Sequence, residues 1–458
     1  MKVNDELNVK IEKLSNLGFG IAKVDGMVIF VENACPKDEL KIKLTKISKN
    51  YANASIVEII TPSDYRVTPF CPMQKVCGAC QLQFIDYDYQ LKLKKEIVED
   101  AMLSIGNLKI EIPDVIPSPE VKEYRCKVQY PIGQTKVSKK ILAGYYKPKS
   151  HEIVNIKYCP IQPEICDKII NFIRETASEL GITGYNEKKH IGDLRHVVIR
   201  HSKATNKNLV IFVINAKKTF KKIEDLANKV YSNFKEVSGV CVNFNPNKTN
   251  LIMTEKTELL VGKNYTKERI LDKTFKIGPN SFFQVNPKSA ENIFGYVKNY
   301  IKENFETPTV FDAYAGVTTF GITVCDVCKK VVSVEENKDA VKWADETLKS
   351  NEITNVELHN MDAEKFFEKE LKTKRRRFNI TILDPPRKGS TEKTLDYTLA
   401  LTKDKIIYVS CNPATLARDL KYLISKGAKI ESIQPFDMFC HTYHIENVAI
   451  IDVKEVNK

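Results

Sequence analysis

A cysteine at residue 411 lies where a thiolate could attack a bound substrate. It belongs to the segment Ser410-Cys411-Asn412-Pro413. The apolar run Ile406 to Val409 predicts a strand before it, and residues 414–423 predict a helix after it. A side chain at such a turn faces the ligand-binding edge of an α/β sheet. A lone cysteine at a strand end usually serves packing, so its role as a candidate nucleophile depends on the other motifs.

Three further segments in the C-terminal part of the chain combine residue types that suit catalysis. They are Ser281-Phe282-Phe283-Gln284-Val285-Asn286, Asp384-Pro385-Pro386-Arg387 and His441-Thr442-Tyr443-His444-Ile445-Glu446. A lone Asp-Pro-Pro is usually a turn, and a lone His-x-x-His usually lies on the surface. All of them at one predicted sheet edge indicate an active site.

The elements that position these segments form a predicted α/β domain over residues 271–458. Apolar strands alternate there with helices, and the strand ends are spaced by about the length of one βα unit. We expect a doubly wound, Rossmann-like parallel sheet with its ligand site beyond the carboxyl ends of the strands. The polar residues at those ends are Asp312, Glu335, Asp362, Asp384 and Cys411.

The residues that follow the first three strands of this domain predict a site for an adenosyl cofactor. Gly316 lies in the first strand-to-helix turn, where it lets a ligand approach the backbone. An acid at the second strand end, here Glu335, commonly accepts hydrogen bonds from ribose hydroxyls. Asp362 at the third end is placed to meet the adenine edge. Because no G-x-G-x-x-G is present, the set resembles the S-adenosylmethionine fold of methyltransferases more than a dinucleotide site.

Residue 318 departs from that fold. Many methyltransferases have glycine here, whereas this chain has Thr318. A β-branched residue does not readily adopt a positive φ. We therefore expect the loop to differ locally from the methyltransferase pattern.

The four motifs together resemble the RNA 5-methyluridine methyltransferase family, in particular the 23S ribosomal RNA (uracil-5-)-methyltransferases. They occur in that family's order, over residues 270–458. One departure is Cys440, where proline is usual. An alternative, an exocyclic-amine methyltransferase, would have an aromatic residue after the two prolines, where this chain has Arg387.

The resemblance implies a covalent mechanism for Cys411 and Glu446. Carbon 5 of uracil is a poor nucleophile, but a thiolate that adds at carbon 6 turns the ring into an enolate that is nucleophilic at carbon 5. Cys411 supplies that thiolate. After methyl transfer a base removes the proton from carbon 5, and the resemblance assigns this step to Glu446.

The resemblance also implies binding roles. Asp384 is expected between cofactor and base, where it accepts a hydrogen bond from uracil N3 and takes part in catalysis. Phe282 is expected to stack on the flipped base. The expected cofactor-binding residues are Gln284, Tyr314, Gly316, Glu335, Asp362 and Asp384.

A cysteine cluster, Cys71-x5-Cys77-x2-Cys80, offers three soft metal ligands, and the resemblance supplies Cys159 as the fourth. Four thiolates suit zinc or a [4Fe-4S] cluster. Zinc ribbons usually have two C-x2-C pairs, whereas one pair and two single cysteines occur here. That asymmetry and the family favour iron and sulfur, with zinc as the alternative. The pair His441 and His444 has no evident third ligand and is expected in a loop without metal.

The N-terminal half is expected to contain two domains. Residues 1–60 contain short alternating strands typical of a small barrel, and they resemble the RNA-binding TRAM module. Residues 61–270 form an expected central α/β domain with the cysteine cluster. Its first helix starts at Tyr87 and places apolar residues on one face and lysines mostly off that face. The apolar residues are Leu91, Val98, Met102 and Ile105, and the lysines are Lys92, Lys94 and Lys95.

Charge, hydropathy and cysteine content indicate which partner and which cellular compartment to expect. A formal net charge of +13 favours a polyanion such as RNA. The sequence has no apolar run of about 18 residues and no signal-peptide pattern at its start, so we expect a cytoplasmic protein without a membrane span. The 12 cysteines are then not a disulfide framework.

These inferences predict an S-adenosylmethionine-dependent RNA uracil-C5 methyltransferase that acts as a monomer. A barrel plus a cysteine cluster resembles the enzymes of 23S ribosomal RNA. A transfer RNA uracil-5-methyltransferase is the first alternative. The second is a non-catalytic RNA-binding or ribosome-assembly factor, which Thr318 favours and which Cys411 and Glu446 oppose. The target uridine is not identified.

Overall fold

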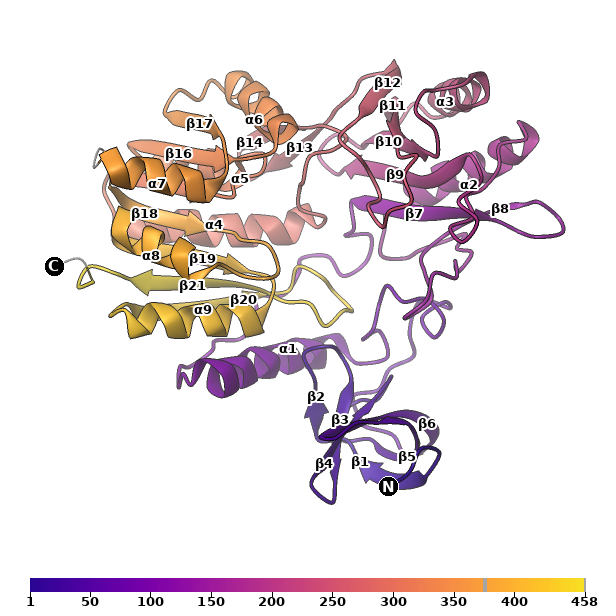
Figure 1. Ribbon diagram of the computed structural model, residues 1–458, viewed down its shortest axis with the longest axis horizontal. Helices are drawn as coiled ribbons and strands as arrows, with labels where there is room; N and C mark the ends of the chain where they lie inside the picture. The colour runs from indigo at the N-terminus through magenta and orange to yellow at the C-terminus, as the bar shows by residue number, and fades with distance from the viewer. Residues whose placement is uncertain (374–376, 457–458) are drawn as a thin grey trace.

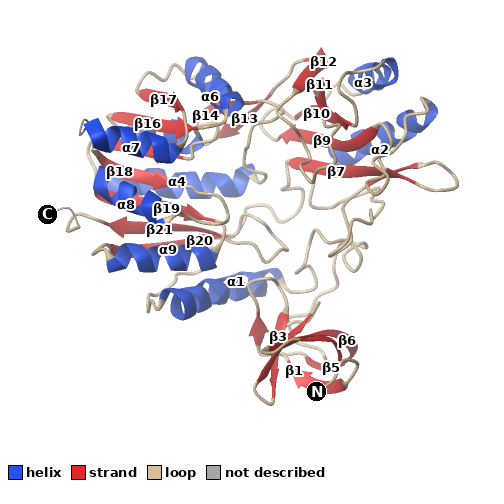
Figure 2. Cartoon of the chain, in the orientation of Figure 1, coloured by secondary structure: helices blue, strands red, loops and turns tan. Residues whose placement is uncertain are grey.

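The computed structural model describes residues 1–373 and 377–456. Three parts follow one another along the chain: a barrel-like sheet, a central α/β part and a C-terminal α/β part (Figure 1). Long loops fill the space between the central and C-terminal sheets (Figure 2). Among the helices of residues 1–373 and 377–456, none has the length and apolar composition of a membrane span.

The strands of the N-terminal sheet alternate apolar and polar residues, so the curled sheet buries its apolar face in a core of its own. In β5 (Glu39–Ile47), Leu40, Ile42 and Leu44 are buried, while their neighbours face outward. The strand order is β1-β5-β6-β4-β3-β2, and β1 also packs near β3. The other strands are β1 (Glu6–Lys10), β2 (Lys13–Leu14), β3 (Gly20–Val24), β4 (Met27–Val31) and β6 (Tyr51–Thr61).

Helix α1 (Tyr87–Ala101) links the barrel to the C-terminal part, and its buried face differs from the prediction. Val98 and Met102 are buried as expected, but Ile105 is 40% exposed. The helix continues as a π-helix, Met102–Gly106, whose wider turn shifts the side-chain periodicity. Lys94, predicted off the apolar face, is fully buried. The prediction for these two residues is wrong.

The central part is a mixed sheet covered on one face by two amphipathic helices. Its strand order is β12-β11-β10-β9-β7-β8. Helices α2 (Glu164–Glu179) and α3 (Lys221–Asn233) bury apolar residues every three or four positions against it. The strands are β7 (Lys127–Gln134), β8 (Ile141–Ala143), β9 (Leu194–Ser202), β10 (Lys207–Ile214), β11 (Val237–Phe244) and β12 (Thr257–Gly262). A hairpin of β13 (Thr266–Ile270) and β14 (Lys273–Ile277) leads into the C-terminal part.

The C-terminal part has the predicted doubly wound sheet, in the order β17-β16-β15-β18-β19-β21-β20. Two details of the prediction are wrong. The edge strand β20 was not predicted, because an edge strand beside solvent lacks a continuous apolar run. Strand β21 is antiparallel to both neighbours. The strands are β15 (Thr309–Ala313), β16 (Lys330–Glu335), β17 (Val356–Asn360), β18 (Phe378–Leu383), β19 (Thr402–Ser410), β20 (Lys429–Phe436) and β21 (Glu446–Asp452).

Helices cover both faces of this sheet. Consecutive residues of β15 show the division, since Val310 packs in the core of one face and Phe311 in the core of the other. Helices α4 (Pro287–Asn304), α5 (Thr319–Val324) and α6 (Lys338–Ser350) contribute to the first core. Helices α1, α7 (Ala363–Thr373), α8 (Glu392–Leu401) and α9 (Pro413–Ser425) contribute to the second. The carboxyl ends of the parallel strands stay open for a ligand.

Candidate active site

A cavity of about 460 Å³ lies at the carboxyl ends of the parallel strands. It brings together residues from all four motifs, which are up to 164 positions apart in sequence by their residue numbers. The predicted site residues that line it are Phe282, Gln284, Tyr314, Gly316, Glu335, Asp384, Cys411 and Glu446. Arg387 and His444 line it as well. Asp362 does not.

Strand register sets Cys411 beside Glu446. Ser410, the last residue of β19, pairs with Asn447 of the antiparallel strand β21. Toward the cavity, the residue after Ser410 is Cys411, and the residue before Asn447 is Glu446, the first residue of β21. The thiol and the carboxyl group therefore leave neighbouring strands at the same level of the sheet edge.

The turn that carries Cys411 is fixed by its neighbour. Asn412 caps α9, since its Oδ1 accepts a hydrogen bond from the Ala414 amide at 3.1 Å. The Asn412 Nδ2 donates to the Arg387 carbonyl at 3.2 Å. Proline at the first helical position, Pro413, suits this start of a helix. The cysteine turn is thereby tied to the Asp-Pro-Pro-Arg motif.

Burial dominates the protonation of the acidic groups. It raises the pKa of Glu446 to about 8, with a further rise from the negative charge of Asp384. It raises the pKa of Asp384 to about 7. It raises the pKa of Cys411 to about 11, and the charge of Glu446 adds to that rise. Arg387 opposes the shifts of Glu446 and Cys411. Perturbed, mutually interacting groups in a cleft are typical of functional sites.

The loop over residues 437–445, which ends at Glu446, is anchored by a buried ion pair. Lys94 Nζ lies 2.7 Å from Asp437 Oδ1, and both side chains are fully buried. Lys94 also donates to the Phe439 carbonyl at 3.1 Å, and the Tyr87 hydroxyl donates to Asp437 Oδ2 at 2.8 Å. The sequence analysis missed Lys94 and Tyr87. A lysine among the apolar positions of α1 was the available signal.

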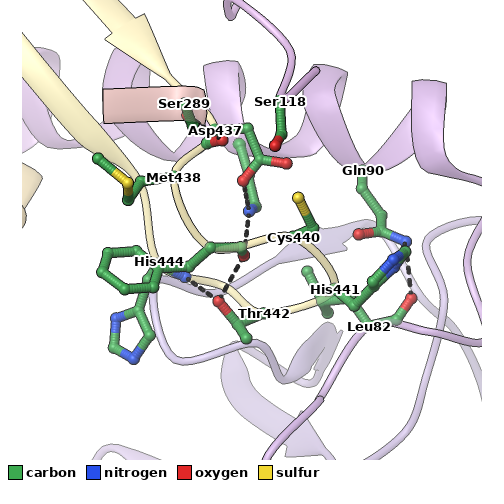
Figure 3. Close-up of polar contacts among 12 residues, drawn as sticks. Leu82, Gln90, Ser118, Ser289, Asp437, Met438, Cys440, His441, Thr442 and His444 are labelled. Atoms are coloured by element: carbon green, nitrogen blue, oxygen red, sulfur yellow. Dashed lines mark hydrogen bonds and ion pairs between the residues drawn. The ribbon is translucent and has the colours of Figure 1, made fainter. Parts of the chain in front are cut away.

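Helix α4 also holds this loop, and Figure 3 shows Ser289 of this helix beside Asp437. Asn286, which caps α4, donates through Nδ2 to the Met438 carbonyl at 3.1 Å and to Ser118 Oγ at 3.0 Å. Ser289 Oγ donates to the Asp437 carbonyl at 2.8 Å. The last residue of the Ser-Phe-Phe-Gln-Val-Asn motif thus positions the loop instead of lining the cavity.

The two histidines of this loop have different surroundings. Figure 3 shows His441 beside Gln90 and His444 on the other side of the loop. His441 Nε2 lies 3.0 Å from the Val121 carbonyl oxygen. Burial lowers the pKa of each histidine to about 4, so both are neutral near pH 7. His444 lines the cavity.

The turn between β15 and α5 adopts left-handed backbone at three residues. Tyr314 has φ +60°, Gly316 has +58° and Thr318 has +61°. The prediction that Thr318 avoids a positive φ is wrong. Its amide donates to the Ala315 carbonyl at 2.7 Å, and its side chain is buried, so the surrounding structure imposes the conformation. Such strain occurs at ligand sites.

Acidic residues stabilise this turn. Glu335 Oε2 accepts a hydrogen bond from the Gly316 amide at 2.8 Å. Asp312 accepts from the Gly321 amide at 3.0 Å, and burial raises the pKa of Asp312 to about 7. Asp362 Oδ1 instead accepts from the Lys365 amide at 3.0 Å, at the start of α7. The structure does not bring Asp362 to the cavity wall.

The four cysteines of the predicted cluster line a separate small cavity of about 20 Å³. Burial raises the pKa of Cys80 and Cys159 to about 12, and it also raises the pKa of Cys71 and Cys77. Among residues 1–373 and 377–456, no three His, Cys, Asp or Glu side chains form a group that could hold a metal ion. Four thiols are suitable donors for a thiolate-bound metal group. Their side chains, however, are not arranged as a metal-binding group in this structure.

Two family models match the chain. The model described as tRNA (Uracil-5-)-methyltransferase matches residues 86–454, and the TRAM domain model matches residues 1–57. An uncharacterized RNA methyltransferase of Halalkalibacterium halodurans is 37% identical over 456 residues, with 98% of each chain covered. Another from Clostridium tetani is 36% identical over 451 residues, with 98% of this chain and 97% of that protein covered.

A solved structure resembles this chain over nearly its full length. It is the Pyrococcus abyssi tRNA (uracil-54, C5)-methyltransferase in complex with S-adenosyl-L-homocysteine. The TM-score is 0.77 at 27% sequence identity, with 97% of this chain and 100% of that chain covered.

Proposed function

Because the chain belongs to the tRNA (uracil-5-)-methyltransferase family and is an S-adenosylmethionine-dependent RNA uracil-C5 methyltransferase, we propose that it methylates carbon 5 of a specific uridine, in 23S ribosomal RNA, through a covalent adduct with Cys411. One observation carries the proposal. The pairing of Ser410 with Asn447 sets the Cys411 thiol beside the Glu446 carboxyl group in a cavity that can hold a base.

The Cys411 thiol starts the reaction. It is protonated near pH 7, because burial raises its pKa to about 11, so its proton leaves to water as the sulfur bonds to carbon 6 of uracil. The electron pair of the carbon 5–carbon 6 double bond then makes carbon 5 nucleophilic. The positive charge of Arg387 favours the thiolate. Bound S-adenosylmethionine supplies the methyl group.

Glu446 ends the reaction. Its carboxylate takes the proton from carbon 5, the electron pair re-forms the double bond, and the Cys411 thiolate leaves carbon 6. A carboxyl group with a pKa of about 8 gains and loses a proton near neutral pH, which suits a general base. A pKa near the usual value of a glutamate would make it a weaker base.

We assign the remaining wall residues to binding. Phe282 is 64% exposed at the cavity, which suits stacking on an incoming base. Asp384 accepts from uracil N3 and borders the cofactor. Glu335 uses its oxygens for the Gly316 and Asn337 amides and keeps lone pairs for ribose hydroxyls. The other proposed cofactor-binding residues are Gln284, Tyr314 and Gly316 on the cavity wall and Asp362 outside it.

Transfer RNA is the second candidate substrate. The similar Pyrococcus abyssi protein, a tRNA (uracil-54, C5)-methyltransferase, supports it. The TRAM domain together with the four-cysteine set supports ribosomal RNA by analogy. The cavity contains both Cys411 and Glu446, which argues against a non-catalytic assembly factor.

Tritium release tests both the reaction and the substrate. The purified protein is mixed with S-adenosylmethionine and with 23S ribosomal RNA or tRNA transcripts that carry tritium at uracil carbon 5. Cofactor-dependent release from the ribosomal transcript supports the proposal, and release from tRNA alone selects the second candidate. Release from neither RNA contradicts the proposed function.

We further propose that Cys71, Cys77, Cys80 and Cys159 hold a [4Fe-4S] cluster, with zinc as the alternative. All four line one cavity, three from the segment over residues 71–80 and one from the central part, so a bound cluster would fasten these segments together. Methyl transfer from S-adenosylmethionine consumes no electrons, and a structural role is sufficient.

The remaining features are proposed from composition and fold. The parts over residues 1–60, 61–270 and 271–458 act as three domains of a cytoplasmic monomer. A formal net charge of +13 supports an RNA partner.

A further inference from the structure

A second cavity, of about 330 Å³, lies in the central part away from the catalytic residues. It opens between β7, β9, the segment over residues 145–153 and the loop over residues 249–252. Rings form much of its wall: Tyr145, Tyr146, His151 and Tyr185. The Tyr146 and His151 rings lie 5.3 Å apart, tilted by 41°. Flat apolar walls of this kind suit a planar ligand.

The same wall carries buried polar atoms without partners. Within the described residues, Nε of Arg195 and Nδ1 of His196 are buried and form no hydrogen bond. Nε of Arg125 and the hydroxyl of Tyr145 share this property, but both residues also lie near the cluster cysteines. Unpartnered buried polar atoms are rare, and several around one cavity indicate a ligand that bonds to them.

His196 suits a neutral hydrogen-bonding ligand. Burial lowers the pKa of His196 to about 4, so its ring is uncharged near pH 7 and offers one donor and one acceptor. The Arg195 guanidinium is held in place, since it donates to the carbonyls of Asn245 and Asn247 at 2.6 and 2.7 Å and lies 4.4 Å from the Tyr185 ring centroid. A nucleobase combines a planar ring with such donors and acceptors.

A basic groove connects this cavity to the active site. A third cavity, of about 610 Å³, shares Tyr145, Tyr146 and His151 with the second and shares Arg387, Phe439 and His444 with the catalytic one. Its wall also contains Arg125, Lys147 and Lys149, and no acidic residue of the described chain lines it, although Lys147 and Lys149 form ion pairs with Glu152 and Glu32 beside it. A groove with cations and aromatic rings is typical of a single-stranded nucleic-acid track.

We propose that the second cavity holds a second base of the RNA substrate, which leaves its stack while a nearby uridine occupies the catalytic cavity. This base packs against Tyr146 and accepts or donates hydrogen bonds at His196 and Arg195, and the RNA backbone between the two bases follows the basic groove. The inference rests on the proposed function, because it assumes an RNA substrate. It adds a recognition site that the reaction itself does not require.

An abasic scan tests this inference. Chemically synthesised RNAs of the fragment that the tritium assay selects each carry one abasic nucleotide, and their Kd values are measured with the wild-type protein. The variant Tyr146→Ala is compared, with Tyr231→Ala as the control, because Tyr231 is a half-exposed tyrosine of the same part that lines none of the three cavities. Thermal unfolding verifies that each variant folds.

The wild-type protein is expected to lose about tenfold in affinity at one abasic position outside the target uridine, the size of one base–aromatic stack. Tyr146→Ala loses about as much with intact RNA and nothing more at that position, whereas Tyr231→Ala behaves as wild type. A methylated RNA that tolerates abasic sites everywhere except at its target overturns the inference and leaves the proposed function intact. The inference is also overturned if an abasic position that weakens binding to the wild-type protein weakens binding to Tyr146→Ala by the same factor.

Discussion

Lys94 and Asp437 form a fully buried ion pair, with 2.7 Å between Nζ and Oδ1, that joins helix α1 to the loop before Glu446. The residues are 343 positions apart in the chain. The pair makes the geometry of the catalytic loop depend on a helix outside the C-terminal sheet. Removing one partner leaves the other charge buried, and that is far costlier than losing a surface pair.

The variant Lys94→Met tests this dependence. Its free energy of unfolding should fall by about 3–5 kcal/mol, because Asp437 loses its cation in a buried place. The control is Lys95→Met, since the Asp114 partner of Lys95 is 97% exposed, and its stability should stay close to wild type. Urea denaturation measures both. If both variants lose the same free energy of unfolding, the buried pair stabilises the protein no more than the surface pair does.

The stability of the protein should depend on Glu446 in a defined pH range. The pKa of Glu446 is raised to about 8 in the folded protein, above its ordinary value of 4.5. Between these values the folded state holds a proton that the unfolded chain has released, so this group lowers stability as pH rises from about 5 to 8. In Glu446→Gln that contribution should vanish, and the variant should gain stability relative to wild type at pH 8. The free energy of unfolding of both proteins is measured at several pH values. If it changes with pH in the same way in both, the pKa of Glu446 is not raised.

Two substitutions in the β15 turn separate backbone strain from packing. Thr318→Gly should be neutral or stabilising by up to about 1 kcal/mol, because glycine adopts φ +61° without the cost that threonine has. Gly316→Ala should destabilise by about 1 kcal/mol through φ alone, since a Cβ there meets no atom within 4 Å. Thermal unfolding measures both. A large loss in Thr318→Gly would mean that its side-chain packing outweighs the strain.

The proposed cluster predicts a metal content. Protein purified without oxygen should contain about four iron and four sulfide per chain. Cys159→Ala should lose most of that content, whereas Cys166→Ala, a buried cysteine in the following helix, should keep it. Iron and acid-labile sulfide analysis gives the answer. Zinc without sulfide would select the alternative, and neither metal in protein that folds normally would remove the cluster.

The sequence predicted those parts of the site that depend on local order. A strand followed by a turn has a recognisable pattern, so the strand ends with Cys411 and Asp384 could be found, and the sheet followed from their spacing. The Lys94–Asp437 pair could not be predicted, because no local pattern links residues so far apart. The left-handed Thr318 contradicted its own conformational preference, which tertiary packing overrode. Strain of this kind is seen only in the structure.

Trapping the adduct tests the central claim most directly. Glu446→Ala is mixed with S-adenosylmethionine and the RNA that the tritium assay selects, then analysed on a denaturing gel and by intact mass. Without the base, the carbon 5 proton stays and the thiolate cannot leave, so the account predicts a protein–RNA species that survives denaturation and carries one added methyl group. The double variant Cys411→Ala, Glu446→Ala should give none. Only free RNA with the single variant, while wild type methylates that RNA, would contradict the account.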